Sequence, residues 1–113
     1  GGTLRLTLYW RAGQALPADY TVFAHLVDAQ GAAVAPPADA PPLAGDWPTT
    51  AWQPGQVVVD ERLIALPPDL PPACCDLRLG WYDPVSGARL TAFQPDGAPW
   101  PDNAVRVRGL GQP

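Results

Sequence analysis

The sequence contains no lysine, and only one histidine and one serine occur among its 113 residues. Its seven positive charges are all arginine and are outnumbered by eleven acidic residues, which gives a net charge of −4. Proteins that bind nucleic acids present a basic surface to the phosphates, so we expect no nucleic-acid partner. The shortage of serine and histidine also leaves few side chains that can act as a nucleophile or as its base.

Long hydrophobic runs are absent too. The chain has no stretch of 18 or more apolar residues, and we therefore expect no direct insertion into a membrane. It also lacks a basic start followed by an apolar core, which is the pattern of a signal peptide. From these features we interpret residues 1–113 as one domain, excised from a longer protein.

Helix-compatible stretches are scarce, because sixteen prolines and eleven glycines interrupt the chain. Hydrophobic residues nevertheless make up 47% of it, which is typical of a packed domain. Apolar and polar residues alternate from residue 3 to residue 11, and this period of two predicts a half-buried strand. Similar patterns predict strands over residues 20–28, 56–66, 74–83, 90–94 and 104–110, with a returning segment over 32–35.

Short strands separated by turns indicate the fold class. We predict an all-β fold, an antiparallel β-sandwich of about six to eight strands, either Ig-like or jelly-roll. Its loops are expected to be rich in proline, at residues 36–54, 67–72 and 95–103. Little or no helix is expected, and a helix fits only as one turn within residues 48–52.

Few residues are candidates for catalysis. Ser86 falls in a predicted turn over 83–87, and His25 falls on a strand whose two faces are both apolar. We interpret His25 as a half-buried, hydrogen-bonding histidine in preference to an acid or a base. Asp60 and Glu61 are neighbours on a strand, so their carboxylates point to opposite faces and cannot act as a pair. We expect Asp60 to bind backbone amides or to pair with an arginine, and we predict no enzyme activity within the chain.

The only cysteines, Cys74 and Cys75, are adjacent. Neighbouring residues on a strand point to opposite faces, so we predict two reduced, partly buried thiols, with a strained disulfide as the alternative. A second thiol pair for a metal site is missing, and the ten aspartates lack the close spacing of a calcium loop. We therefore expect no cofactor and no metal.

Five tryptophans are the best lead to a binding role. Trp10 and Trp81 fall on inward faces of predicted strands, and we assign them to the core. Trp47, Trp52 and Trp100 fall in loops, where a flat indole can stack on the apolar face of a sugar ring. The candidate sugar platform comprises Trp47, Trp52, Trp100 and Tyr82. The alternative is that the three loop indoles fold over the open ends of the sandwich and seal its core.

Arginines on predicted strands offer a second kind of site. Arg5, Arg78, Arg106 and Arg108 all point outward in the expected alternation. A guanidinium can bind a carboxylate or a phosphate through two parallel hydrogen bonds. The alternative, which the sequence favours, is a solvated face on which Asp76 partners these side chains.

Several segments carry a resemblance to a known family. They are residues 6–11 (LTLYWR), 20–28 (YTVFAHLVD), 48–55 (PTTAWQPG), 57–60 (VVVD), 66–72 (LPPDLPP) and 79–90 (LGWYDPVSGARL). Together they resemble the C-terminal β-sandwich domain of bacterial multi-spanning glycosyltransferases of the dolichyl-phosphate-mannose protein mannosyltransferase type (family 39-like). The resemblance covers nearly the whole chain. It departs from the family at Ala73, Cys74 and Cys75, where the family usually has Gly-x-Tyr.

The resemblance implies a non-catalytic accessory domain of a membrane glycosyltransferase, exposed on the extracytoplasmic face of a bacterial membrane. Such a domain supports the transferase, contacts a partner or holds a glycan acceptor, so its expected partners are a glycan or the transferase's membrane domain. The catalytic acidic residues of such transferases map onto none of these 113 residues. A carbohydrate-binding module and a secreted structural or adhesion module are the alternative functions.

The resemblance also bears on one edge of the predicted sandwich. The family's domain normally begins with a strand upstream of the Gly-Gly-Thr start of this sequence. Without that strand a sheet edge is left open, and an open edge can pair with another strand. We therefore expect that edge-strand pairing between copies of the chain is feasible.

Overall fold

The computed structural model describes residues 2–70 and 74–108, and these residues contain no α-helix. Five strands form the domain: β1 (Gly2–Arg11), β2 (Thr21–Val27), β3 (Val57–Leu66), β4 (Asp76–Tyr82) and β5 (Val105–Val107). Three short 3₁₀ turns lie between them: η1 (Pro42–Gly45), η2 (Thr49–Ala51) and η3 (Pro101–Asn103). The expected all-β class is confirmed. A helical turn lies within residues 48–52 as expected, but η1 and η3 lie outside that range, where the sequence predicts none.

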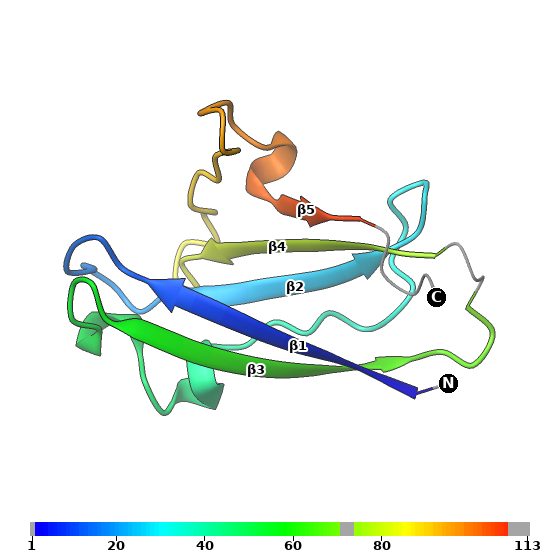
Figure 1. Cartoon of the computed structure of the whole chain (residues 1–113), viewed down its shortest axis with the longest axis horizontal. Coiled ribbons are helices and arrows are strands. Elements are labelled where there is room, and N and C mark those ends of the chain that lie inside the picture. The colour runs from blue at the N-terminus through cyan, green and yellow to red at the C-terminus, as the bar shows by residue number, and fades with distance from the viewer. Residues whose placement is uncertain (1, 71–73, 109–113) are drawn as a thin grey trace.

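The strands make two antiparallel sheets (Figure 1). β1 pairs with β3 along its whole length, from Gly2 opposite Leu66 to Arg11 opposite Val57. In the other sheet β4 lies between β2 and β5, and Figure 1 shows the β1–β3 ribbon running obliquely to these strands. Among the described residues, β1 and β3 each have one edge without a strand beside it. Pairing of such an edge with a second copy stays a prediction.

The core lies between the two sheets. β1 alternates as predicted, with half-buried side chains at every second position: Leu4, Leu6, Leu8 and Trp10. Ile64 of β3 lies beside them in the same sheet, and buried aliphatic residues of β2 and β4 face them from the other sheet: Ala24, Leu26, Leu77 and Leu79. Burial of one large aliphatic side chain contributes about 1.5–3 kcal/mol. This shared cluster is therefore the main apolar contact between the sheets.

A charged pair lies in the same interior, on the inward face of β3. Asp60 is 1% exposed and Arg62 is 7% exposed, and Arg62 Nη2 donates to Asp60 Oδ2 at 2.9 Å. The carboxylate also accepts the indole N–H of Trp10 at 3.4 Å and the backbone N–H of Leu43 at 3.2 Å. The prediction that Asp60 pairs with an arginine is confirmed, and Glu61 is exposed on the opposite face as expected.

Arg62 ties β3 to the chain that runs beside β2. Its guanidinium donates to four backbone carbonyls at distances from 2.8 to 3.4 Å: those of Val22, Ala38, Ala40 and Pro41. A buried charge is tolerated only where protein groups replace the water that it loses. Here one carboxylate and four carbonyls do so. The guanidinium thereby joins the two sheets and the start of the long 36–54 loop at one point.

The expected six to eight strands reduce to five within the described residues. Residues 90–94, predicted as a strand, contribute only one isolated bridge, between Phe93 and Pro99. Among the described contacts, the segment meets β4 only through the bond from the Leu90 N–H to the Trp81 carbonyl, because β5 occupies the same edge of β4 from Leu77 to Leu79. The last strand, predicted over 104–110, is shorter as β5, and residues 109 and 110 lie outside the described part of the chain.

The returning segment expected at residues 32–35 is likewise no regular strand and forms a single bridge with β2. The backbone nevertheless follows β2 as far as Ala40, which exchanges two hydrogen bonds with Val22 at 3.0 and 3.1 Å. Two adjacent prolines within this stretch withhold their donors, so the pairing remains irregular. Residues 33–40 are named the flanking segment below, because they extend the sheet beyond β2.

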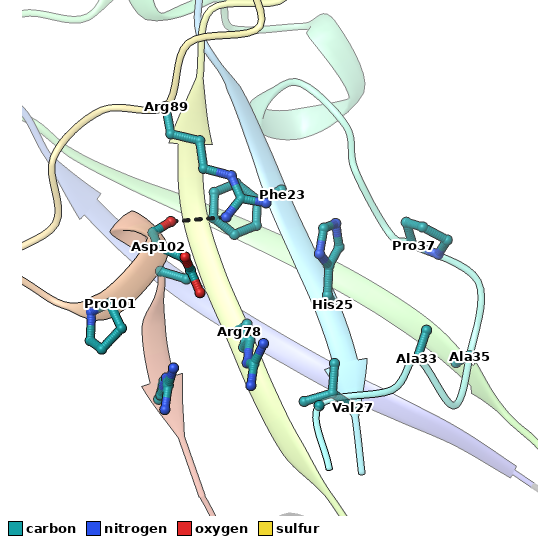
Figure 2. A pocket seen from close by; sticks show the side chains of 13 residues that line it. Phe23, His25, Val27, Ala33, Ala35, Pro37, Arg78, Arg89, Pro101 and Asp102 are labelled. Atoms are coloured by element: carbon teal, nitrogen blue, oxygen red, sulfur yellow. Dashed lines mark hydrogen bonds between the residues drawn. The ribbon is translucent and has the colours of Figure 1, made fainter. Parts of the chain in front are cut away.

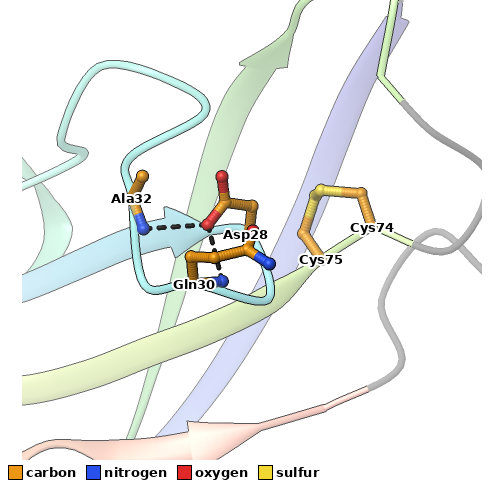
Figure 3. The surroundings of a disulfide bond; sticks show 5 residues. All are labelled: Asp28, Gln30, Ala32, Cys74 and Cys75. Carbon is orange, nitrogen blue, oxygen red and sulfur yellow. Dashed lines mark hydrogen bonds between the residues drawn. A yellow bond between two sulfur atoms is a disulfide. The ribbon is translucent and has the colours of Figure 1, made fainter.

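The bonding of the two cysteines differs from the expected reduced thiols. Cys74 and Cys75 are joined by a disulfide, and both residues are buried in the apolar core (Figure 3). The prediction of two reduced thiols is wrong because it places both on a strand, where neighbours point to opposite faces, whereas β4 begins only after them. Figure 3 shows the disulfide beside the turn at Asp28. The neighbouring Ala73 and the end of the 67–72 connector lie outside the described residues.

We predict that Asp60→Ala lowers the free energy of unfolding by about 3–5 kcal/mol, since it leaves the Arg62 guanidinium buried without its carboxylate. Glu61→Ala is the matched control, because Glu61 is exposed and meets Arg5 at 3.4 Å on the surface. A surface ion pair of that kind contributes about 0–1 kcal/mol. Urea unfolding followed by tryptophan fluorescence measures both variants. Equal losses in the two would contradict the role assigned to the buried pair.

Candidate functional site

One of the three loop tryptophans is buried. Trp52 is only 5% exposed, and its indole N–H donates to the backbone carbonyl of Trp47 at 2.9 Å. Its ring meets Trp81 edge to face, with the two centroids 5.8 Å apart. Trp81 in turn lies 4.7 Å from Trp10, the two residues assigned to the core from the sequence. Trp52 therefore belongs to a buried aromatic cluster with Trp10 and Trp81, and its ring offers no open face to a sugar.

The other members of the candidate sugar platform lie apart. Trp47 is 40% exposed, whereas Trp100 and Tyr82 are half-buried. The ring of Tyr82 lies near that of Phe23 on the outer face of the β2–β4–β5 sheet, with the two ring centroids 6.5 Å apart. Among the described residues, no ring contact joins any two of Trp47, Trp100 and Tyr82. The structure thus brings Trp52 to the core and leaves Trp47 as the most exposed of the four.

Short hydrogen bonds hold the η2 turn, which leads into Trp52. Thr49 is buried, and its hydroxyl donates to a carbonyl and accepts an N–H of the 18–20 segment, at 2.7 and 2.9 Å. The hydroxyl and the backbone N–H of Thr50 both donate to Asp19 Oδ1, at 2.6 and 3.1 Å. These two bonds, the hydroxyl's above all, hold the pKa of the Asp19 carboxyl below its usual value because they stabilise the ionised form.

The lowered pKa of Asp19 predicts a pH-dependent contribution to stability. A carboxyl with a lower pKa in the folded protein stabilises the fold above its unfolded-state pKa of about 4, and this contribution is lost as the pH falls through the folded-state value. The loss of melting temperature caused by Asp19→Asn should therefore shrink between about pH 6 and about pH 3. Thermal unfolding across that range measures it. The same trend in the control Asp46→Asn, at an exposed aspartate, would contradict the assignment.

The candidate catalytic residues are each engaged in local structure. His25 is half-buried, and its Nε2 lies 3.1 Å from Asp39 Oδ1, as expected of a hydrogen-bonding histidine. Ser86 lies in an exposed turn, where its hydroxyl oxygen accepts the N–H of Ala88 at 3.2 Å. Asp60 is held in the buried ion pair. In residues 2–70 and 74–108, no three His, Cys, Asp or Glu side chains are placed to hold a metal ion.

The outer face of the β2–β4–β5 sheet carries a cavity of about 360 Å³ (Figure 2). Its base is formed by strand residues, with His25 from β2, Arg78 from β4 and Arg106 from β5, and Arg89 reaches over it from the loop that follows β4. The flanking segment lies along one side and η3 along the other, as Figure 2 shows: Ala33, Ala35, Pro37, Pro101 and Asp102. This feature is named the basic cavity.

Strand register places three side chains of the basic cavity in one row. His25 lies opposite Arg78 in the β2–β4 pair, and Arg78 lies opposite Arg106 in the β4–β5 pair. Like charges that face each other directly destabilise a sheet. Within the described residues neither arginine makes an ion pair, and the buried Nε of each has no acceptor. An unsatisfied buried donor costs about 1–3 kcal/mol. The fold therefore keeps two unpaired positive charges in this row at a cost in stability.

The outward direction predicted for Arg78 and Arg106 is confirmed, but the partner expected for them is wrong. Asp76 makes no ion pair with either residue among the described contacts. It lies at the first position of β4, opposite Val27 at the end of β2, and so at the margin of the row. The arginines therefore face a cavity and not a neutralised surface.

Gly80 leaves space for the Phe23 ring at the floor of the basic cavity. Phe23 is buried and lies opposite Gly80 across β2 and β4, and a Cβ added to Gly80 would overlap the phenyl ring. The guanidinium carbon of Arg89 lies 4.1 Å above the centre of that ring, and Arg89 Nη1 donates to the carbonyl of Asp102 at 2.9 Å. Sequence reasoning misses Arg89. The signal for Gly80 is its position inside a strand pattern, which indicates close approach of another group.

Gly80→Ala is expected to lower the free energy of unfolding by about 1–3 kcal/mol, because the new methyl group must displace the Phe23 ring. Gly13→Ala is the matched control, since open space surrounds Gly13 and its φ is not positive. At such a position alanine is neutral or stabilises by about 0.4–1 kcal/mol. Chemical denaturation compares the two variants. A stability of Gly80→Ala equal to that of Gly13→Ala would contradict the close packing at this base.

Comparison of the chain with protein-family models, with curated proteins and with solved structures finds no match. Among the described residues, no helix has the length and the apolar character needed to cross a membrane. What the chain does is therefore inferred from its side chains and their arrangement, together with the resemblance seen in its sequence.

Proposed function

We propose that this chain is a non-catalytic accessory domain of a membrane glycosyltransferase, exposed on the extracytoplasmic face of a bacterial membrane, where it holds a glycan acceptor or another partner. The basic cavity is the observation that carries the binding role. It is concave and lined by Arg78 and Arg106, and neither guanidinium group makes an ion pair among the described residues.

The engagement of the candidate catalytic side chains supports binding over catalysis. Group transfer or hydrolysis needs a nucleophile with a base, or two carboxylates that face one substrate. The hydroxyl of Ser86 bonds within its own turn, and the ring of His25 is held by Asp39. Asp60 and Glu61 lie on opposite faces of β3. In this arrangement each of these groups serves the local structure.

The two sheets support the assignment to a β-sandwich of Ig-like or jelly-roll type. Their inner faces share one apolar cluster, to which β1 and β3 contribute from one side and β2 and β4 from the other. Interlocking side chains between two facing antiparallel sheets are how a sandwich forms its core. Domains of this type bind partners with side chains on an outer face or in end loops, and the basic cavity lies on such a face.

Deletion of residues 1–113 from the complete transferase tests this function. We expect the turnover at saturating acceptor to stay nearly unchanged and the acceptor KM to rise by about tenfold, because a remote binding domain supplies uniform binding. The assay uses membrane vesicles in which immunoblotting shows equal amounts of full-length and deleted protein.

Loss of turnover to background in the deleted protein would contradict the non-catalytic role. An acceptor KM that does not change would contradict the role in holding the acceptor. A gene whose reading frame encodes no membrane-spanning segment would contradict the attachment to a membrane transferase.

A further inference from the structure

We infer that the basic cavity binds an oxyanion, a carboxylate or a phosphate carried by a molecule of monosaccharide size, between Arg78 and Arg106. The inference rests on the proposed function only in taking this cavity as the binding site. It names the chemical class of the ligand, an acidic or a phosphorylated sugar, and the groups that recognise its charge.

Positive charge is concentrated at the basic cavity. Three of the seven arginines of the chain line it, although the chain as a whole carries a net charge of −4. Asp102 is the one carboxylate among the lining residues, and it forms no ion pair with these arginines in the described structure. Asp39 lies beside the row and is engaged with His25. A concave surface with an excess of one charge attracts ligands of the opposite charge.

The donors of the row match an oxyanion in number and direction. Arg78 and Arg106 extend from directly opposite positions on neighbouring strands, which places their Cβ atoms about 5 Å apart. Each planar guanidinium can direct two parallel N–H groups at two oxygen atoms. An anion between the two side chains would offset the repulsion between the like charges, which no ion pair among the described residues does.

The volume of the cavity is larger than that of a bare anion. Its volume of about 360 Å³ lies at the lower end of the range of about 300–1,000 Å³ for small-molecule sites. One water molecule takes up about 30 Å³, so an ion of four or five heavy atoms leaves most of the space unfilled. The flanking segment lines that space with apolar groups of Ala33, Ala35 and Pro37. The body of a monosaccharide fits between this wall and η3.

Packing holds Arg78 and Arg89 in place before a ligand arrives. A Cβ added to Gly31 would lie 3.3 Å from Arg78 Nη2, so the guanidinium rests against the backbone of the turn after β2. Arg89 is fixed over the Phe23 ring and by its hydrogen bond to the carbonyl of Asp102. Side chains that are already ordered lose little freedom on binding, which favours affinity.

Binding to the 113-residue chain is measured by calorimetry and by the NMR signals of the arginine Nε–H groups. The four probes are glucose 1-phosphate, glucuronate, glucose and inorganic phosphate. We expect one saturable site for the two acidic sugars, with shifts of the Arg78 and Arg106 signals. Glucose and inorganic phosphate are expected to bind at least about tenfold more weakly, because glucose lacks the anionic group and phosphate lacks the sugar ring.

Variants locate the site. Arg78→Gln and Arg106→Gln should each weaken the binding of the acidic sugars by about tenfold or more, and Arg78→Lys, which keeps the charge but loses the fork, by less. Arg5→Gln is the matched control, because it removes the same charge from an exposed pair on the other sheet. It should change the affinity by less than about twofold. Asp102→Asn removes the lining carboxylate, keeps a residue type that tolerates its φ of 57°, and should tighten binding.

Circular dichroism establishes that each variant is folded. Equal weakening by Arg5→Gln and Arg78→Gln, or no saturable binding of either acidic sugar, overturns the inference. Inorganic phosphate that binds as tightly as glucose 1-phosphate overturns the monosaccharide-sized ligand. Binding of glucose alone, with a change in tryptophan fluorescence, overturns the anion site and leaves the proposed function standing. Acidic-sugar binding at this site, with an acceptor KM unaffected by the deletion, supports the inference and contradicts the proposed function.

Discussion

Asp60 and Arg62 form an ion pair in the interior of the domain, where either charge alone would be strongly destabilising. Removing each from water costs several kcal/mol, and the fold compensates with partners from separate parts of the chain. Trp10 and Leu43 donate to the carboxylate, while carbonyls of β2 and of the 38–41 stretch accept from the guanidinium. Because these partners must be in place together, the pair fixes β1, β2, β3 and the long loop relative to one another.

The same ion pair helps to explain the conformation of η1 and the position of the flanking segment. Leu43 and Ala44 have φ values of 51° and 55°, a left-handed conformation that costs an ordinary L-residue about 1–2 kcal/mol. The bond from the Leu43 N–H to Asp60 and the packing of its side chain near Trp52 offset that strain. On the other side, two of the carbonyls that Arg62 binds, those of Ala38 and Ala40, belong to the end of the flanking segment. A buried structural pair thus helps to position one wall of a surface cavity that it does not line.

Much of this fold is predictable from the sequence, for a definite physical reason. β1 and β3 each have one face in the core, so their residues must alternate, and a carboxylate on the inward face, Asp60, must find donors. The same reasoning fails at residues 90–94, where the side chains suit a strand but β5 occupies the edge of β4 with which they would pair. It also fails at Cys74 and Cys75, because alternation does not reveal that β4 starts after them.

The candidate site is less predictable, since it depends on contacts between distant segments. Alternation points Arg78 and Arg106 outward, but only the register of β4 against β5 sets them face to face. Burial of Trp52 likewise depends on Trp81, which lies 29 residues along the chain and at a centroid distance of 5.8 Å. The arginines differ in one respect that matters for function. Arg62 pairs with a carboxylate within the fold, whereas Arg78 and Arg106 make no ion pair among the described residues. Because one side-chain type carries both patterns, it is the lack of a neutralising carboxylate, and not the arginines themselves, that favours the outer face as a binding surface.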